Sequence, residues 1–292
     1  MSTAKFHQIQ YTEYWEGRTG QTFGVEELLY SRRSPYQQVQ VWQTDAFGRI
    51  LTLDGLVMLT ERDEFIYHEM ISHPALCLLE APRRVLVVGG GDGGTVREVL
   101  RHPEVEQVDL VEIDAAVVEA ARAFFPNLAC AFDDPRLRLH LADGVAFARQ
   151  APSSFYDVVI VDSTDPIGIA EGLFGEAFYR DVARILGADG ILVAQTESPF
   201  DRLFQHTIRA AHGFLRGLFP IVSMYLAFIP SYPTGMWSFT LASKSLHPVR
   251  DFDSERVRAR IASFEAALRY YNPDVHIAAF ALPNFVRQQL EA

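Results

Sequence analysis

Residues 85–94 read Val-Leu-Val-Val-Gly-Gly-Gly-Asp-Gly-Gly, an apolar run followed by a glycine-rich loop that carries one carboxylate, Asp92. Four apolar residues bounded by glycines are typical of a buried strand, and residues 95–100 continue with a helix-compatible pattern. This strand-loop-helix order holds ligands over the edge of a sheet. The glycines also fit the dinucleotide pattern G-x-G-x-x-G, but Asp92 would repel a pyrophosphate there. The loop therefore predicts a site for a cation.

Alternating strand and helix patterns continue beyond this loop. Strands are expected at residues 85–88, 108–113, 137–141, 157–161 and 190–194. Such alternation predicts an α/β fold with a parallel, doubly wound, Rossmann-like sheet, of the kind also found in nucleoside-binding methyltransferase-like proteins. Residues 221–243 are rich in β-branched and aromatic side chains and predict two more strands.

The N-terminal part follows a different pattern. Apolar and polar residues alternate from residue 6 to about residue 50, which predicts a small antiparallel β unit. Helical spacing at residues 65–73 predicts a helix that links this unit to the larger sheet. We therefore expect an N-terminal β domain with its linking helix over residues 1–75 and a Rossmann-like domain over residues 76–292.

The charge balance favours cationic partners. The 292-residue chain has a formal net charge of -11, which argues against nucleic acid or an anionic membrane surface as a partner. It contains no apolar run near eighteen residues, and its polar N-terminus does not resemble a signal peptide, so a cytoplasmic location is expected. The two cysteines and the histidines have no zinc-type spacing, so no metal site is expected.

Carboxylates follow four of the predicted strands, at the sheet edge where ligands bind. Glu112 lies about twenty residues after the glycine loop, where an acidic side chain can accept the hydroxyl groups of a ribose. Asp143, followed by Gly144, can accept a hydrogen bond from an adenine amine, although an ordinary Asp-Gly turn explains it as well. Asp114 is better explained as a helix N-cap. A nucleoside ligand is therefore expected.

The segment Asp162-Ser-Thr-Asp-Pro adds two carboxylates, Asp162 and Asp165, on a loop that Pro166 stiffens. Crowding them near Asp92 would be unfavourable unless a cation binds between them, which predicts a polycation site. Mg²⁺ is the rival cation, but it usually binds together with phosphate, and nothing here indicates a phosphate site. Three further residues remain ambiguous: Tyr67 and His68 in the linking-helix segment, and Tyr232, which either closes over a pocket or only packs.

The residues resemble those of a known family, the polyamine aminopropyltransferases, which include the spermidine synthases. The resemblance covers nearly the whole chain and is most specific in the second and last of the following blocks: Leu53-Asp-Gly, Thr60-Glu-Arg-Asp-Glu-Phe-Ile-Tyr-His-Glu-Met, Gly89-Gly-Gly-Asp-Gly-Gly, Val111-Glu-Ile-Asp, Asp162-Ser-Thr-Asp-Pro, Ile229-Pro-Ser-Tyr-Pro, and residues 270–283 from Tyr-Tyr-Asn-Pro onward.

The resemblance implies transfer of an aminopropyl group from decarboxylated S-adenosylmethionine to putrescine, which gives spermidine and methylthioadenosine. It implies no metal or redox cofactor and a homodimer or homotetramer. The donor site would comprise Gln37, Asp92, Glu112, Asp143, Gly144 and Ile169. The acceptor site would comprise Tyr67, His68, Asp92, Asp162, Asp165 and Tyr232, with Asp162 as the proton acceptor.

Two positions depart from the family pattern and leave the acceptor amine open. Met58 stands where many relatives have glutamine, and Ile169-Ala170 replaces a common Gly-Pro sequence. Cadaverine, agmatine, diaminopropane and spermidine remain alternative acceptors. Other classes also compete: a methyltransferase, whose donor carboxylate Asp92 would repel; a polyamine-binding protein without turnover; and an NAD dehydrogenase, against which Asp92 argues.

Overall fold

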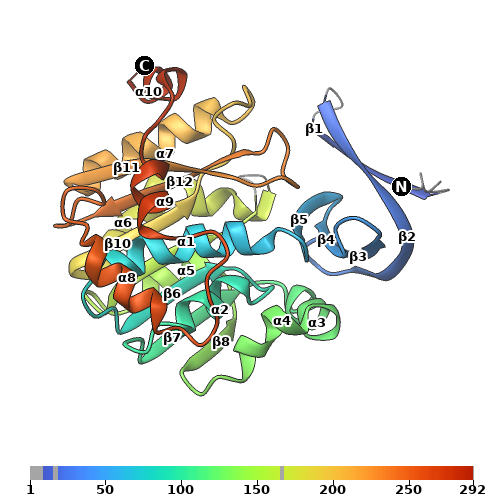
Figure 1. Cartoon of the computed structure of the whole chain (residues 1–292), viewed down its shortest axis with the longest axis horizontal. Helices are drawn as coiled ribbons and strands as arrows, with labels where there is room; N and C mark the ends of the chain where they lie inside the picture. The colour runs from blue at the N-terminus through green and yellow to red at the C-terminus, as the bar shows by residue number, and fades with distance from the viewer. Residues whose placement is uncertain (1–8, 16–18, 165–167, 292) are drawn as a thin grey trace.

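Two β-sheets stand side by side in the computed structural model, which describes residues 9–15, 19–164 and 168–291, apart from the side chains of residues 168 and 169 (Figure 1). The N-terminal sheet contains five antiparallel strands in sequence order. They are β1 (Ile9–Trp15), β2 (Thr19–Arg33), β3 (Gln38–Thr44), β4 (Arg49–Leu53) and β5 (Leu56–Thr60). The predicted antiparallel β unit is therefore confirmed.

The N-terminal sheet packs against the rest of the chain through one apolar face. Val39 and Val41 of β3 and Leu51 and Leu53 of β4 form a core with helix α3 (Ala115–Phe124). Residues two apart in a strand share a face, so the alternation in sequence produces this apolar layer. The contact places the N-terminal sheet at one end of the second sheet.

The second sheet has seven strands in the order β11-β12-β10-β9-β6-β7-β8. Their bounds are β6 (Arg84–Gly89), β7 (Gln107–Glu112), β8 (Leu137–Leu141), β9 (Tyr156–Asp162), β10 (Leu186–Gln195), β11 (Ile221–Phe228) and β12 (Met236–Ser243). Within the sheet, strands β6 to β10 all pair in parallel. A short connection joins β11 and β12 into an antiparallel hairpin. β12 also pairs with β10 in the antiparallel direction. The predicted Rossmann-like, methyltransferase-like sheet is confirmed.

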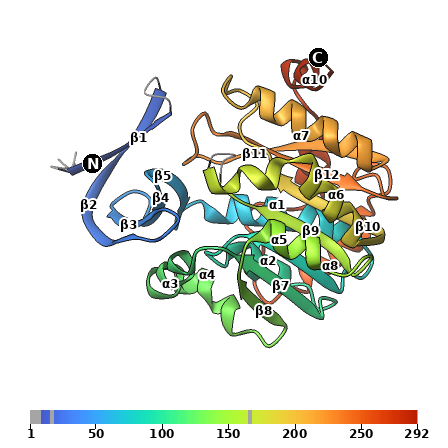
Figure 2. The same ribbon diagram turned by 180° about the vertical axis from the view of Figure 1, so that it is seen from behind.

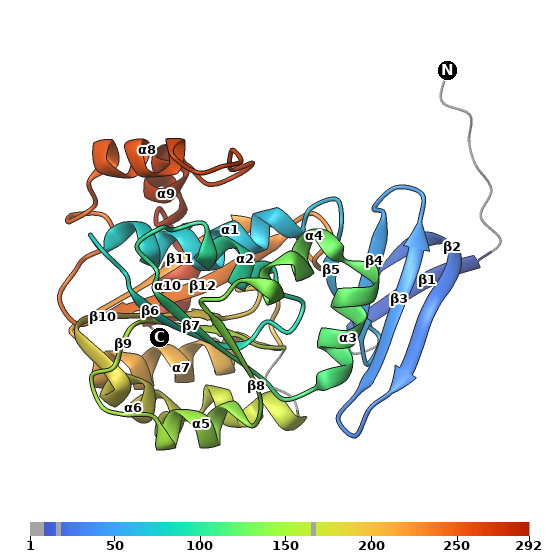
Figure 3. The same cartoon turned by 90° about the horizontal axis from the view of Figure 1, so that it is seen from below.

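Helices cover both faces of this sheet (Figures 2 and 3). On one face lie α1 (Glu64–Leu78), α2 (Gly94–Leu100), α8 (Ser254–Ala262) and α9 (Pro273–Ala279). On the other lie α5 (Gly144–Gln150), α6 (Glu176–Ile185) and α7 (Gln205–Leu218). The remaining elements are α4 (Pro126–Ala129), η1 (Cys130–Asp133), η2 (Gly168–Phe174) and α10 (Asn284–Glu291). Two apolar cores result, one on each face.

The linking helix predicted at residues 65–73 is α1, and nearly all of it is buried. It runs from the N-terminal sheet to the larger sheet and presents Tyr67 and His68 to the gap between them. The domain division expected after residue 75 lies inside this helix and stays a prediction.

Within the part of the chain that is described, no single helix is long and apolar enough to cross a membrane. One sharply bent pair, α3 followed by residues 126–133, meets the same criteria of length and composition when the two are taken together. Side chains of that pair, including Val117, Ala120 and Leu128, are buried in the core beneath the N-terminal sheet.

Candidate functional site

A cavity of about 960 Å³ lies between the two sheets, at the carboxyl ends of the parallel strands. The N-terminal sheet contributes Leu51, Leu53 and Met58 to its wall. Nine of the residues predicted from the sequence line it: Gln37, Tyr67, His68, Asp92, Glu112, Asp143, Gly144, Asp162 and Tyr232. Asp165 lies outside the described residues, as does the side chain of Ile169, whose backbone belongs to η2. Most of the predicted site is thus brought together in one cavity.

The glycine-rich loop approaches the neighbouring strand ends more closely than a side chain would allow. Gly89 has a φ of 81°, and a Cβ there would overlap the carbonyl group of Asp162. A Cβ on Gly91 would lie 2.6 Å from the Oε2 atom of Glu112. Glycine is therefore required at these two positions for the loop to pass between β9 and β7.

The buried carboxylate of Asp162 accepts two short hydrogen bonds from hydroxyl groups. The Tyr67 hydroxyl donates to Oδ1 at 2.7 Å, and the Thr95 hydroxyl donates to Oδ2 at 2.6 Å. Burial and the nearby charge of Asp92 raise the pKa of Asp162 above its usual range, although the charge of His68 and the two hydroxyl donors oppose this rise. Asp162 is thus a fixed carboxylate with an increased affinity for a proton.

Asp92 is fixed at the other side of the same space. Its Oδ1 atom accepts a hydrogen bond from the backbone N–H of Gly94 at 2.7 Å and lies 3.2 Å from Nε2 of His68. Burial disfavours its charge, but the charge and hydrogen bond of His68, the Gly94 N–H and the charge of Arg97 together outweigh burial and lower the pKa of Asp92. One nitrogen or oxygen atom from each of His68, Asp92 and Asp162 lies within 4.8 Å of the others. These groups form one compact, charged cluster.

Glu112 and Asp143 lie on the opposite part of the cavity wall. Glu112 accepts hydrogen bonds from the backbone N–H groups of Gly91 at 3.1 Å and Asp114 at 2.8 Å. Burial raises the pKa of Glu112 to about 7, and the Asp114 carboxylate adds to this rise. Asp143 caps α5 through its Oδ1 atom, which accepts a bond from Val145 N–H at 2.8 Å. Its Oδ2 atom takes no part in this cap.

Asp114 connects the two sheets at the edge of the cavity. Its Oδ1 atom caps α3 by accepting a bond from Ala116 N–H at 3.0 Å, so the predicted N-cap is confirmed. Its Oδ2 atom accepts hydrogen bonds from the Ser34 hydroxyl at 2.7 Å and from Nε2 of Gln37 at 3.0 Å. Gln37 therefore reaches the cavity from the N-terminal sheet while it is held by the larger one.

A second pocket of about 340 Å³ adjoins the cavity and shares residues with it. Tyr232 forms part of both walls, and its hydroxyl donates to the carbonyl oxygen of Met58 at 2.6 Å. The remaining wall of the second pocket includes Trp15, Val57, Gln195, Pro233 and Trp237. Of these, Gln195 donates to the carbonyl oxygen of Ser163 at 3.0 Å. Pro233 belongs to the Ile229-Pro-Ser-Tyr-Pro block, but sequence reasoning missed Trp15, Val57, Gln195 and Trp237 because they come from four separate strands and form no local motif.

Comparisons with protein-family models identify both parts of the chain. Residues 64–254 match the spermine/spermidine synthase domain, and residues 9–61 match the spermidine synthase tetramerisation domain. The first match covers more than half of the chain. The chain therefore belongs to the spermine/spermidine synthase family and is a transferase, as the sequence motifs predicted. The second match indicates that it forms homo-oligomers.

Individual relatives agree with this assignment over the full length. The polyamine aminopropyltransferase of Clostridioides difficile is 44% identical over 284 residues, which cover 97% of this chain and 99% of that protein. That of Moorella thermoacetica is 48% identical over 268 residues, with 92% and 91% covered. Spermidine synthase from Thermotoga maritima superimposes with a TM-score of 0.92 at 41% identity, covering 100% of this chain and 97% of that one. A spermidine synthase in complex with the transition-state analogue AdoDATO gives a TM-score of 0.93 at 41% identity, with 100% and 98% covered.

Proposed function

We propose that this enzyme transfers an aminopropyl group from decarboxylated S-adenosylmethionine to putrescine, giving spermidine and methylthioadenosine. The main supporting observation is the charge of the cavity. Among its described lining residues, the charged groups are the carboxylates of Asp92, Glu112, Asp143 and Asp162, together with His68. The donor carries a sulfonium and an ammonium, and putrescine carries two ammonium groups. Carboxylates attract both substrates.

The proposed donor site uses the Glu112 side of the cavity for the nucleoside. Glu112, which lines this side, would accept the ribose hydroxyls, and the Asp143 oxygen outside the helix cap would accept a hydrogen bond from the adenine amine. A Cβ at Gly144 would overlap Val88, so backbone and strand are already closely packed there. Gln37 and Ile169 complete the proposed set, and Asp92 would bind the aminopropyl ammonium.

The proposed acceptor site begins at Asp162 and extends into the second pocket. Tyr67 and Tyr232, whose ring centres are 5.9 Å apart, form the boundary between the two spaces. A slender diamine would lie along these rings with one nitrogen at Asp162. His68 and, by family resemblance, Asp165 are proposed to complete this site.

Asp162 is the proposed proton acceptor for the attacking amine. A primary ammonium has a reference pKa of about 10.4, so the acceptor arrives protonated and lacks a free electron pair. Asp162 accepts one proton from this ammonium, which frees the electron pair on nitrogen, and the neutral amine then attacks the carbon next to the sulfonium. The C–S bond breaks with its electron pair going to sulfur. Methylthioadenosine leaves as a neutral thioether, so the proposed reaction requires no metal or redox cofactor.

Tyr67 and Thr95 would assist this step by fixing the base. Their hydroxyl groups occupy one lone pair on each oxygen of Asp162, so the carboxylate cannot rotate freely. Holding base, nucleophile and donor in line supplies much of the acceleration in such displacements. The raised pKa of Asp162 favours acceptance of the proton once transfer has begun.

A panel of amines tests the proposed acceptor directly. Methylthioadenosine formation would be measured with decarboxylated S-adenosylmethionine and either putrescine, cadaverine, agmatine, diaminopropane or spermidine. The highest kcat/KM is expected with putrescine. A clear preference for another amine would retain the transferase chemistry and replace putrescine as the substrate. Binding of the amines without turnover would instead favour a polyamine-binding protein.

We further propose that the homo-oligomer is a tetramer or a dimer assembled through the N-terminal sheet, because residues 9–61 match a tetramerisation domain. Light scattering on the purified protein would distinguish these states as four or two times the chain mass of 32.9 kDa. A monomer would contradict both. The cytoplasmic location expected from the sequence stays a prediction.

A further inference from the structure

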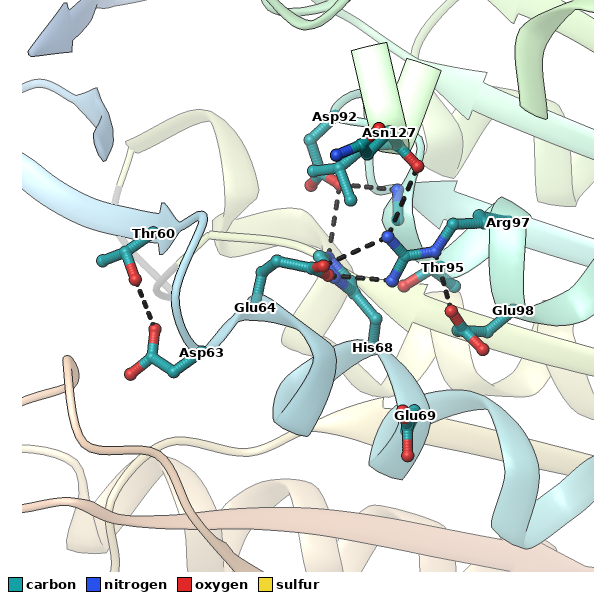
Figure 4. Close-up of polar contacts among 12 residues, drawn as sticks. Thr60, Asp63, Glu64, His68, Glu69, Asp92, Thr95, Arg97, Glu98 and Asn127 are labelled. Carbon is teal, nitrogen blue, oxygen red and sulfur yellow. Dashed lines mark hydrogen bonds and ion pairs between the residues drawn. The ribbon is translucent and has the colours of Figure 1, made fainter. Parts of the chain in front are cut away.

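A line of alternating charges leads from the cavity to the contact between α1 and α2 (Figure 4). Beginning at Asp92, it passes through His68 and Glu64 on α1 to Arg97 on α2. The side chains of His68 and Glu64 are 3% and 10% exposed, and that of Arg97 is 16% exposed. The proposed reaction uses the first two groups of this line and leaves Glu64 and Arg97 without a role.

Glu64 is held from two directions. Arg97 grips it with two nitrogens, Nη1 at 3.1 Å from Oε1 and Nη2 at 2.9 Å from Oε2. Oε2 also lies 2.6 Å from Nδ1 of His68. The Nε atom of Arg97 donates to Glu98 at 2.7 Å, which fixes the guanidinium plane. A paired guanidinium and carboxylate of this kind have a defined orientation.

The contacts on His68 indicate its charge state. Its two ring nitrogens face two different carboxylates, Glu64 and Asp92. Only the imidazolium has a donor on both nitrogens, so this arrangement selects the protonated ring. We propose that Glu64 and Arg97 are positioning residues that hold His68 as an oriented imidazolium and thereby fix Asp92 for the ammonium of the donor. The inference rests on the proposed function, which assigns that ammonium to Asp92.

Asp92 shows the consequence of this arrangement. The contacts that fix it, from His68 and Gly94, both fall on Oδ1. Oδ2 therefore remains for a ligand in the cavity that Asp92 lines. A rotated Asp92 would present a different oxygen or direction, and a misplaced carboxylate would weaken the hold on the aminopropyl chain.

Glu64 supplies one of the negative charges around the buried His68 ring. The charged and titratable groups that face this ring or act on it at close range are Glu64, Asp92, Arg97, Asp162 and Tyr67. Burial disfavours the charged ring, but Asp92 and Glu64 together raise the pKa of His68 to about 10. Without the charge of Glu64, His68 would lose its proton at lower pH, and below that pH the site would carry one more positive charge than the wild type.

The test variant is Glu64→Gln, which retains the shape of the side chain and removes its charge. Donor affinity in the wild type is expected to show no dependence on His68 titration between about pH 6 and pH 9. In Glu64→Gln, affinity for decarboxylated S-adenosylmethionine should weaken as the pH falls across this range, on the order of tenfold, because the imidazolium then opposes the donor's charges. Methylthioadenosine, which lacks the amine, should show a much smaller change.

The charge of His68 can be read without any ligand. Nitrogen NMR of histidine-labelled protein, assigned with His68→Gln, should show both ring nitrogens protonated throughout this range in the wild type. In Glu64→Gln one of them should lose its proton as the pH rises. The double variant Glu64→Gln/Arg97→Met, which removes both members of the pair, should retain the altered His68 titration.

Glu69→Gln is the matched control on the same helix. Glu69 is a buried carboxylate that accepts backbone hydrogen bonds from residues 269–271, whereas the His68 ring is paired with Glu64 and Asp92. This variant should lower thermal stability and leave the pH dependence of donor affinity unchanged. An unchanged His68 titration and an unchanged donor profile in Glu64→Gln would overturn the inference. If neither ligand binds the wild type, the proposed function itself fails.

Discussion

Replacing Asp162 with asparagine removes the proposed base while keeping nearly the same shape. Loss of a positioned general base lowers rates by about 10²–10⁴-fold, which corresponds to about 3–5 kcal/mol in the activation barrier. The wild-type rate should also fall as the pH decreases through the raised pKa of Asp162, because the protonated acid cannot accept the amine's proton. Asp162→Asn should lack this dependence.

The structure indicates that this variant will fold. Asparagine retains one oxygen as an acceptor, so the hydroxyl of either Tyr67 or Thr95 loses its acceptor and faces an amide N–H instead, at about 1–3 kcal/mol. Removal of a buried charge beside Asp92 acts in the opposite direction, because burial and Asp92 already disfavour the ionised Asp162. These opposing effects should leave the melting temperature within about 5 °C of the wild type.

The assay would measure methylthioadenosine formation at saturating donor and putrescine, with calorimetric binding of methylthioadenosine as the control. We expect kcat to fall at least a hundredfold, on the order given above, with the nucleoside affinity retained. An Asp162→Asn enzyme with more than about a tenth of the wild-type kcat would refute the role of Asp162 as the base. Loss of nucleoside binding as well would indicate a damaged cavity instead.

Three further changes test other parts of the site. The pKa of Glu112 is raised to about 7, and only its carboxylate form accepts both ribose hydroxyls, so methylthioadenosine affinity should increase from about pH 6 to pH 8. Glu112→Gln should bind methylthioadenosine about 10–100-fold more weakly and without this pH dependence. A wild-type affinity that calorimetry finds independent of pH would contradict the assignment. Gly89→Ala should lower the free energy of unfolding in urea by at least about 2 kcal/mol, because the φ of Gly89 is 81° and a Cβ would overlap the end of β9. The control Gly213→Ala on α7, where a Cβ meets nothing within 4 Å, should raise it by about 0.5–1 kcal/mol. Equal effects of the two changes would refute the close approach of Gly89 to β9. Prolonged treatment with EDTA should leave kcat unchanged, because the proposed displacement needs no metal. An activity loss that a divalent cation reverses would contradict this and would indicate a metal bound by His68, Asp92 and Asp162.

Much of the fold could be predicted because its signals are local. The apolar run before the glycine loop is β6, and the other predicted parallel strands match β7 to β10 to within a few residues. Carboxylates at the ends of parallel strands must meet at one sheet edge, which is why Asp92, Glu112 and Asp162 could be assigned to one cavity before any coordinates.

The remaining parts of the site depend on packing between distant segments. Glu64 and Arg97 are 33 positions apart, and their contact exists only because α1 and α2 pack side by side. Thr95 looks like an ordinary residue in the first turn of α2, yet its hydroxyl reaches Asp162 on β9. Trp15 reaches the second pocket only because the N-terminal sheet stands against the larger one. No periodicity or motif in the sequence encodes such pairs.

Selectivity between two donors tests the central claim most directly. Decarboxylated S-adenosylmethionine and S-adenosylmethionine differ by one carboxylate beside the amine that Asp92 is proposed to bind, and two like charges at close range repel each other. With putrescine present, mass spectrometry should detect spermidine and methylthioadenosine in equal amounts from the decarboxylated donor and no transfer from S-adenosylmethionine. Methyl transfer from S-adenosylmethionine, or no product from the decarboxylated donor with any amine, would contradict the account.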